Sequence, residues 1–282
     1  MSSIMSGKRG LVMGVANDHS IAWGIARTLA QHGAELAFTY QGESLKKRVE
    51  PLAASVGSSL LLPCDVEDLA SVDAVFAALQ ERWGRLDFLV HAIAFSDKNE
   101  LKGRYADTTR ENFTRTMVIS CFSFTEVAKR AAALMTNGGS MVTLTYGGST
   151  RVMPNYNVMG VAKAALEASV RYLASDYGAQ NIRVNAISAG PVRTLAGAGI
   201  ADARLMFNYQ KRHAPLRRTV TIEEIGGSGL YLLSDLSTGV TGEIHYVDSG
   251  YNIISMPQPE ALKTVDAAET AAEALAAGQA AE

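Results

Sequence analysis

In the segment GLVMGVANDHSIAWG, residues 10–24, the spacing of the apolar residues changes from a pattern typical of a strand to one typical of a helix. An apolar run over residues 10–16 predicts a strand, and Gly14 permits a tight turn directly after it. From Ser20 onward the apolar residues recur at helical spacing, with Ser20 as the expected N-cap and Gly24 allowing the helix to lie close to a sheet. A strand joined by a glycine turn to a helix is the unit of doubly wound parallel sheets.

Strand-like and helix-like segments alternate along almost the whole chain, and this alternation predicts an α/β protein. The pattern indicates one doubly wound, Rossmann-type domain over residues 1–260, with a parallel sheet of about seven strands and helices on both faces. An Ala- and Glu-rich tail of low complexity follows over residues 261–282. Further strands are expected at 34–40, 59–66, 86–94, 139–148, 182–190 and 242–250, and helices at 20–32, 44–56, 69–84 and from about 157 to 177.

Composition excludes several classes of protein. The 282 residues carry a formal net charge of −2, whereas a nucleic-acid-binding protein usually has a basic excess. Two distant cysteines, Cys64 and Cys121, give neither a disulfide framework nor metal-ligand spacing, and we expect buried thiols. No apolar signal core begins the chain, and no stretch reaches the roughly 20 apolar residues that cross a bilayer. We therefore expect a cytoplasmic protein that binds neither nucleic acid nor membrane.

Several turns at the carboxyl ends of predicted strands converge on one ligand, because such sheets bind ligands at that edge. After the first strand, the glycine turn and the N-terminus of the following helix suit a pyrophosphate, although the turn lacks the GxGxxG pattern. The turns CDV (64–66), AIAF (92–95) and SAGPVRT (188–194) would meet the rest of a dinucleotide. The predicted cofactor-binding residues are Gly14, Ser20, Ile21, Gln41, Asp65, Val66, Ile93, Lys163, Val192 and Thr194.

The residue after the second strand bears on the choice of dinucleotide. An acidic residue there would hold the ribose 2′-hydroxyl of NAD, but this chain has the neutral Gln41, which can still bond a ribose hydroxyl or pack under adenine. Lys46, Lys47 and Arg48 follow, and they either meet a 2′-phosphate or form a solvated helix face. We favour NADH as the cofactor.

The segment LTYGGSTRVMPNYNVMGVAK, residues 144–163, contains two tyrosines and one lysine that suit reductase chemistry. Tyr156 and Lys163 are seven residues apart, about two helical turns, so their side chains face the same way. A lysine there can hold ribose hydroxyls, and a tyrosine hydroxyl can donate to a developing oxyanion. From geometry alone, both Tyr146 and Tyr156 could equally be core-edge residues and Lys163 a surface charge.

These motifs resemble the short-chain dehydrogenase/reductase superfamily over nearly the whole chain. That superfamily usually carries Tyr-x3-Lys and an upstream serine, but here Met159 occupies the usual tyrosine position and Tyr146 the serine position. The chain is more similar to the divergent NADH-dependent enoyl-acyl-carrier-protein reductases of bacterial type II fatty-acid synthesis. The shared features are Tyr-x6-Lys, the Gly-x5-Ser-Ile turn, the Gln after the second strand, and the segments SIAWGIA, LVHAIAF, YGGSTRVMPNYNVMGVAKAALE and NAISAGPVRT.

The resemblance implies reduction of a trans-2-enoyl thioester carried by acyl-carrier protein. Tyr156 would donate to the thioester oxygen, Lys163 would fix the ribose and favour the anion, and Tyr146 would position the substrate. Ala94 replaces a glycine found in many relatives and would narrow the site. Substrate-binding residues are expected to be Ser96, Tyr146, Tyr156, Met159, Met206 and Phe207.

Two further segments have predicted roles. Residues 195–216 either form a surface helix pair or a lid with an apolar inner face, whose Arg204, Lys211 and Arg212 would meet an acidic carrier protein. Residues 222–235 and the last strand look like the subunit interface of the superfamily, which implies a homotetramer.

Two other functions remain open. A keto- or hydroxy-directed reductase of the same superfamily is disfavoured by Met159, because the usual proton donor is absent there. A non-catalytic dinucleotide-binding protein would not need to keep Tyr156, Lys163 and the lid. Turnover of enoyl against ketoacyl thioesters separates these functions.

Overall fold

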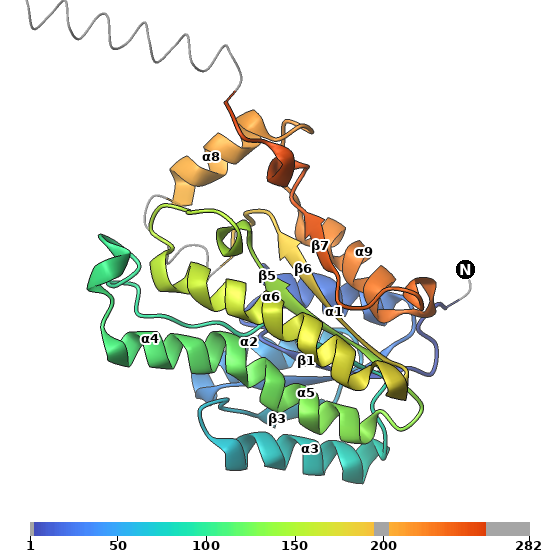
Figure 1. Ribbon diagram of the computed structural model, residues 1–282. Coiled ribbons are helices and arrows are strands. Elements are labelled where there is room, and N and C mark those ends of the chain that lie inside the picture. Colours follow the sequence, from blue (N-terminus) through green and yellow to red (C-terminus); the bar gives the residue numbers. More distant parts are fainter. Residues whose placement is uncertain (1–2, 195–202, 258–282) are drawn as a thin grey trace, which may run out of the picture.

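The computed structural model describes residues 3–194 and 203–257, in which a parallel sheet is the central layer (Figure 1). Its strands are Arg9–Met13 (β1), Glu35–Tyr40 (β2), Leu60–Pro63 (β3), Phe88–His91 (β4), Gly139–Thr145 (β5), Ile182–Ala189 (β6) and Ile244–Val247 (β7). The strand order is β3-β2-β1-β4-β5-β6-β7, so the direction of winding reverses between β1 and β4. All neighbouring pairs are parallel, which confirms the predicted doubly wound α/β fold.

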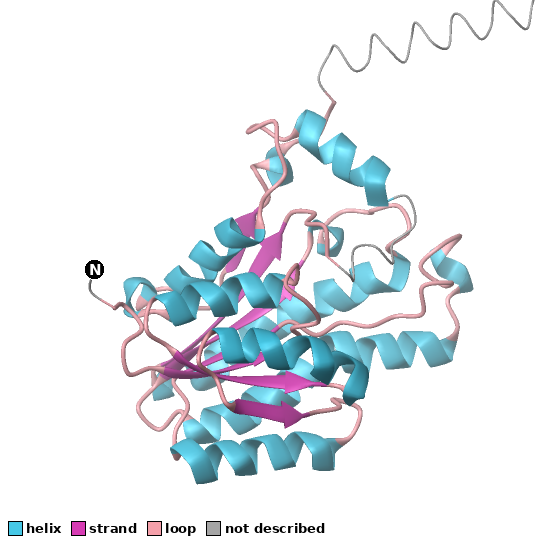
Figure 2. Cartoon of the chain, turned by 180° about the vertical axis from the view of Figure 1, so that it is seen from behind, coloured by secondary structure: helices cyan, strands magenta, loops and turns pink. Residues whose placement is uncertain are grey.

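Helices cover both faces of the sheet, as Figure 1 and the reverse view in Figure 2 show. Ile21–Gln31 (α1), Gly42–Ser55 (α2) and Ile222–Leu233 (α9) pack against one face. Leu69–Trp83 (α3), Ser123–Leu134 (α5) and Asn157–Tyr177 (α6) pack against the other. Successive strand residues alternate between these two cores, and both are apolar, so the strands read as continuous hydrophobic runs.

Four other short segments lie near the carboxyl edge of the sheet. The helix Arg110–Met117 (α4) runs through a π-helical turn, Val118–Phe122 (η2), into α5. A 3₁₀ turn, Gly147–Ser149 (η3), connects β5 towards α6. The helix Ala203–His213 (α8) stands beyond the end of β6 in Figure 1.

Close contact between α1 and α9 depends on glycines. A Cβ on Gly24 would lie 2.4 Å from the carbonyl oxygen of Ile222, and a Cβ on Gly226 would lie 2.6 Å from the carbonyl oxygen of Gly24. The prediction that Gly24 lets α1 approach the sheet was therefore wrong. The glycine instead lets two helix backbones touch, a contact that sequence periodicity cannot reveal because the partner is about 200 residues away.

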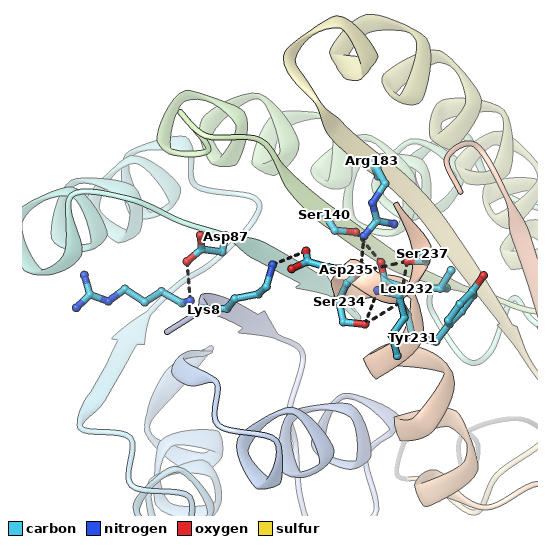
Figure 3. A network of polar contacts seen from close by, with 11 residues as sticks. Lys8, Asp87, Ser140, Arg183, Tyr231, Leu232, Ser234, Asp235 and Ser237 are labelled. Atoms are coloured by element: carbon cyan, nitrogen blue, oxygen red, sulfur yellow. Dashed lines mark hydrogen bonds and ion pairs between the residues drawn. The ribbon is translucent and has the colours of Figure 1, made fainter. Parts of the chain in front are cut away.

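Polar contacts at the amino edge of the sheet fix the C-terminal end of α9 (Figure 3). The Ser140 hydroxyl at the start of β5 donates to the carbonyl of Leu232 at 2.8 Å. The guanidinium of Arg183 at the start of β6 donates to the carbonyl of Ser234 at 3.0 Å. These bonds satisfy carbonyl groups that the end of a helix leaves free.

Some sequence expectations concern residues outside the described ranges. The tail at 261–282 and the first part of the predicted lid, residues 195–202, lie there. In the described part of the chain, none of the helices combines the length and apolar character needed to span a membrane. Within the same residues no cluster of His, Cys, Asp or Glu could hold a metal ion.

Candidate active site

A cavity of about 1100 Å³ lies at the carboxyl edge of the sheet. Its walls are built by the loops after β1, β4, β5 and β6 together with α6 and α8. This is the edge at which doubly wound sheets bind ligands, next to the reversal of strand order. The predicted residues that line it are Ile21, Ser96, Tyr146, Tyr156, Met159, Lys163, Val192, Thr194, Met206 and Phe207.

The turn between β1 and α1 brings the chain to this edge. Gly14 has a φ of +97°, and a Cβ there would lie 2.1 Å from the carbonyl oxygen of Ala92, so a glycine is required as predicted. Ser20 occupies the N-cap position, but its side chain does not cap α1. Its hydroxyl oxygen instead accepts the N–H groups of Ala16 and Asn17, both at 3.0 Å. The expected capping role was thus wrong, and Ser20 stabilises the turn.

A second group of predicted residues lies at the carboxyl ends of β2 and β3. The Gln41 carboxamide donates to a carboxylate oxygen of Asp65 at 2.9 Å, so the two side chains form one polar unit. The other Asp65 oxygen accepts the N–H of Glu67 at 2.9 Å, which fixes the turn after β3. Val66 is buried in the core, and Ile93 packs against that core. Together with Gly14 and Ser20, these four residues do not line the cavity.

Tyr156 is held at the N-terminus of α6 with its ring almost fully buried. Tyr146 contacts it edge-on, with 5.2 Å between the ring centroids. The residues on either side, Asn155 and Asn157, have φ values of 56° and 34°, an uncommon left-handed backbone that turns the tyrosine into the cavity wall. Burial, with a smaller effect of Tyr146, raises the pKa of Tyr156 far above its usual value, so the hydroxyl stays protonated at neutral pH.

Lys163 lies two turns further along α6 and is 6 % exposed. Its ammonium group donates to the carbonyl oxygen of Leu144 at 2.7 Å. Burial lowers the pKa of Lys163 from 10.5 to about 8, against the opposing influence of Cys121 and Glu167. The buried Glu167 accepts a hydrogen bond from Thr145 at 2.6 Å. This carboxylate is not among the site residues predicted from the sequence, although its position one helical turn after Lys163 was a usable signal.

The wall after β4 depends on the π-helical turn η2. The Ser120 hydroxyl accepts from the N–H of Phe95 and donates to the carbonyl of the same residue, both at 2.9 Å. One turn along, Ser123 bonds the fully buried ring of His91 at 2.9 Å. Burial, followed by the charge of Lys163, lowers the pKa of His91 to about 3, so its ring is neutral. Ser120 is not among the site residues predicted from the sequence, because nothing in a helical pattern marks a π turn.

A buried tyrosine and a buried lysine from one helix, set in a cavity at the carboxyl edge of a doubly wound sheet, define a short-chain reductase type of site. A family model described as enoyl-(acyl carrier protein) reductase matches residues 14–252. The chain belongs to this family.

Close relatives carry the same description. The chain is 77% identical to enoyl-[acyl-carrier-protein] reductase [NADH] 2 of Rhizobium meliloti (strain 1021), a match that covers 95% of this chain and all of that protein. Its fold is similar to the crystal structure of FabI from Candidatus Liberibacter asiaticus, with a TM-score of 0.90, 64% identity, and coverage of 92% and 100% of the two chains. The reductase of Anaplasma phagocytophilum in complex with NAD gives a TM-score of 0.88 at 59% identity, covering 90% and 97%.

Proposed function

We propose that this protein reduces the trans-2 double bond of enoyl-acyl-carrier-protein thioesters with NADH, in fatty-acid elongation. The observation that carries this proposal is the presence of Tyr156 and Lys163, both buried, in the wall of one large cavity. Met159, which also lines it, has no hydroxyl with which to protonate an alkoxide, and this favours enoyl over ketone reduction. Relatives named as NADH-dependent enoyl-acyl-carrier-protein reductases support the same activity.

The carboxyl edge of the sheet fits a dinucleotide. The cavity is large enough for a nicotinamide and a substrate together, and Ile21, Val192 and Thr194 would line the nicotinamide end. Gln41 and Asp65 would meet the adenosine end, where their joined amide and carboxylate offer both donors and acceptors. Lys163 would donate to ribose hydroxyls. When bound, NADH supplies the hydride that is added to the β-carbon of the substrate.

Tyr156 would stabilise the negative charge that develops on the thioester oxygen. Its hydroxyl is a good donor at this position because burial keeps it protonated through the physiological pH range. The positive charge of Lys163 favours the enolate from the same side of the cavity, which is a low-dielectric setting where such a charge acts strongly. The α-carbon then receives a proton from solvent. The T-shaped contact with Tyr146 limits the positions that the Tyr156 ring can adopt.

The acyl chain would lie against α8. Met206 and Phe207 line the cavity from this helix and give it an apolar wall, which would suit the inner face of a lid. Arg204, Lys211 and Arg212 on the same helix would approach the acidic carrier protein. We further propose a cytoplasmic homotetramer, with α9 and β7 at a subunit interface. The exposed Tyr231 and Tyr246 on these elements are suitable anchors for such a contact.

The test is oxidation of NADH with crotonyl and longer enoyl thioesters, compared with acetoacetyl thioesters. We expect turnover with the enoyl substrates only. In Tyr156→Phe, loss of one oxyanion donor lowers kcat by about 10²- to 10³-fold while the Kd for NADH is unchanged. Turnover of ketoacyl but not enoyl substrates would show that the protein is a different reductase. NADH binding without any turnover would favour a non-catalytic dinucleotide-binding protein.

A further inference from the structure

The position of the Tyr156 ring is set by a glycine in the loop above it. A Cβ built on Gly148 of η3 would lie 2.5 Å from Cδ1 and 2.7 Å from Cε1 of Tyr156, and its third-nearest atom, at 3.5 Å, is Cγ of the same ring. Gly148 does not have a positive φ, so its backbone conformation alone would accept an alanine. The obstacle to any side chain at this position is therefore the tyrosine ring itself.

The opposite side of the contact is equally close. A Cβ on Gly160, in the first turns of α6, would lie 2.7 Å from the carbonyl oxygen of Gly148. The loop and the helix thus meet backbone to backbone, and the ring of Tyr156 lies in the slot beside this contact. Tyr146 bounds the ring elsewhere, with 5.2 Å between centroids. We propose that Gly148 is a positioning residue, whose missing side chain holds the Tyr156 hydroxyl where it can meet the substrate oxygen.

This inference rests on the proposed role of Tyr156 as the hydrogen-bond donor in enoyl reduction. The inference adds that the Tyr156 hydroxyl can donate to the substrate only when its ring lies in the space that Gly148 leaves open.

The loop is less free to yield than the ring. The backbone N–H of Arg151 donates to the carbonyl of Gly147 at 3.2 Å and closes the turn. The Arg151 guanidinium donates to the carbonyl oxygens of Ile254, at 3.1 Å, and of Asn252, which fastens the loop to the segment on its far side. A methyl group on Gly148 would consequently push the Tyr156 ring rather than the loop. Restoring an ordinary carbon–carbon contact of about 3.5 Å requires a ring displacement of about 1 Å.

A displacement of this size matters for catalysis, because a misplacement of about 1 Å can cost about 10²-fold in rate. We therefore expect Gly148→Ala to lower kcat for an enoyl thioester by about 10²-fold. Binding of NADH should stay within about twofold of the unchanged protein, since the dinucleotide would contact Lys163 and the loops after the other strands.

The chain offers a matched control one residue away. A Cβ on Gly147 would have Met153 Cε at 3.6 Å as its nearest atom, an ordinary contact. Gly147→Ala carries the same added methyl in the same turn and should keep kcat within about threefold. Four full-length proteins are then compared with the unchanged one: Gly148→Ala, Gly147→Ala, Tyr156→Phe and the double variant Gly148→Ala/Tyr156→Phe. The Kd for NADH and the thermal midpoint of each report whether it is folded.

The double variant separates positioning from general damage to the fold. If Gly148 acts through the tyrosine hydroxyl, adding Gly148→Ala to Tyr156→Phe lowers kcat no further, because the hydroxyl has already been removed. Multiplicative losses in the double variant would overturn the inference, as would a Gly148→Ala protein that behaves like Gly147→Ala. Failure of Gly148→Ala to fold and bind NADH would also overturn it, by making the glycine a requirement of the fold.

These outcomes are distinct from failure of the proposed function. A normal kcat in Tyr156→Phe would overturn the role of Tyr156 and the inference with it. A large loss in Tyr156→Phe alongside normal kcat in Gly148→Ala would leave the proposed function standing and overturn only the inference.

Discussion

Lys163 should make the reaction sensitive to pH near 8. Its buried ammonium group has a pKa of about 8. The group is therefore about 90% charged at pH 7 and about 10% charged at pH 9. If this charge holds the cofactor and favours the enolate, kcat/KM for NADH should fall about tenfold between these values, with its midpoint near pH 8.

The two buried tyrosines and the buried histidine of the site titrate outside this window. Burial raises the pKa of Tyr146 to about 12 and raises that of Tyr156 further, while it lowers the pKa of His91 to about 3. The effect on stability has the opposite sign. Lys163 binds fewer protons in the folded state between pH 8 and its unfolded pKa near 10.5, so its contribution to stability rises with pH across this interval. A loss of activity caused by deprotonation of Lys163 can therefore be distinguished from a loss caused by unfolding.

The assay is initial-rate NADH oxidation with crotonyl thioester from pH 6 to pH 10, with NADH varied and each sample returned to pH 7 to show recovery. Lys163→Arg is the matched control, because arginine stays charged throughout. This variant should have a lower but flat profile between pH 7 and pH 9. A flat profile for the unchanged protein up to pH 10, or the same midpoint near pH 8 in Lys163→Arg, would refute the reasoning.

Two other predictions concern a close helix contact and a pair of hydrogen bonds. Gly226→Ala should lower the free energy of unfolding by about 1–3 kcal/mol, because its Cβ would lie 2.6 Å from the carbonyl oxygen of Gly24. Gly227→Ala is the control, because a Cβ there would have open space around it, and it should raise that free energy by up to about 1 kcal/mol. Equal unfolding midpoints for the two variants in denaturant would contradict this explanation. Ser120→Ala removes both hydrogen bonds between the Ser120 side chain and the Phe95 backbone. It should raise KM for the enoyl substrate severalfold and leave NADH affinity unchanged. An unchanged KM would show that the Phe95 backbone does not need these bonds.

The sequence was sufficient for the architecture because hydrophobic periodicity is a local property. Over residues 3–194 and 203–257 the strands total seven as expected, and the helices predicted at 20–32, 44–56, 69–84 and 157–177 are all observed. The discrepancies lie at the carboxyl ends of strands. The strands predicted over 59–66 and 86–94 end earlier than expected, at Pro63 and His91. Apolar residues continue past both points, but there they form the loops of the site.

The candidate site was predictable in its residue types and not in its contacts. Counting along one helix was enough to expect Tyr156 and Lys163 on the same side, and both line the cavity. The pairing of Gln41 with Asp65 and the fit between Gly148 and the Tyr156 ring join different strands and loops. Such contacts depend on the relative placement of elements to within an ångström, which no pattern along the chain encodes.

The glycine contact between α1 and α9 also affects how the protein folds during its synthesis. The helix that follows the first strand meets a partner about 200 residues later in the chain, and this partner also packs against β5 and β6. During synthesis, the N-terminal half therefore emerges long before its covering helix and must wait with part of its core open to water. Long sequence separation of this kind slows folding. We expect a nascent chain that stops short of residue 222 to be a substrate for chaperones, and the site to form only when synthesis is nearly complete.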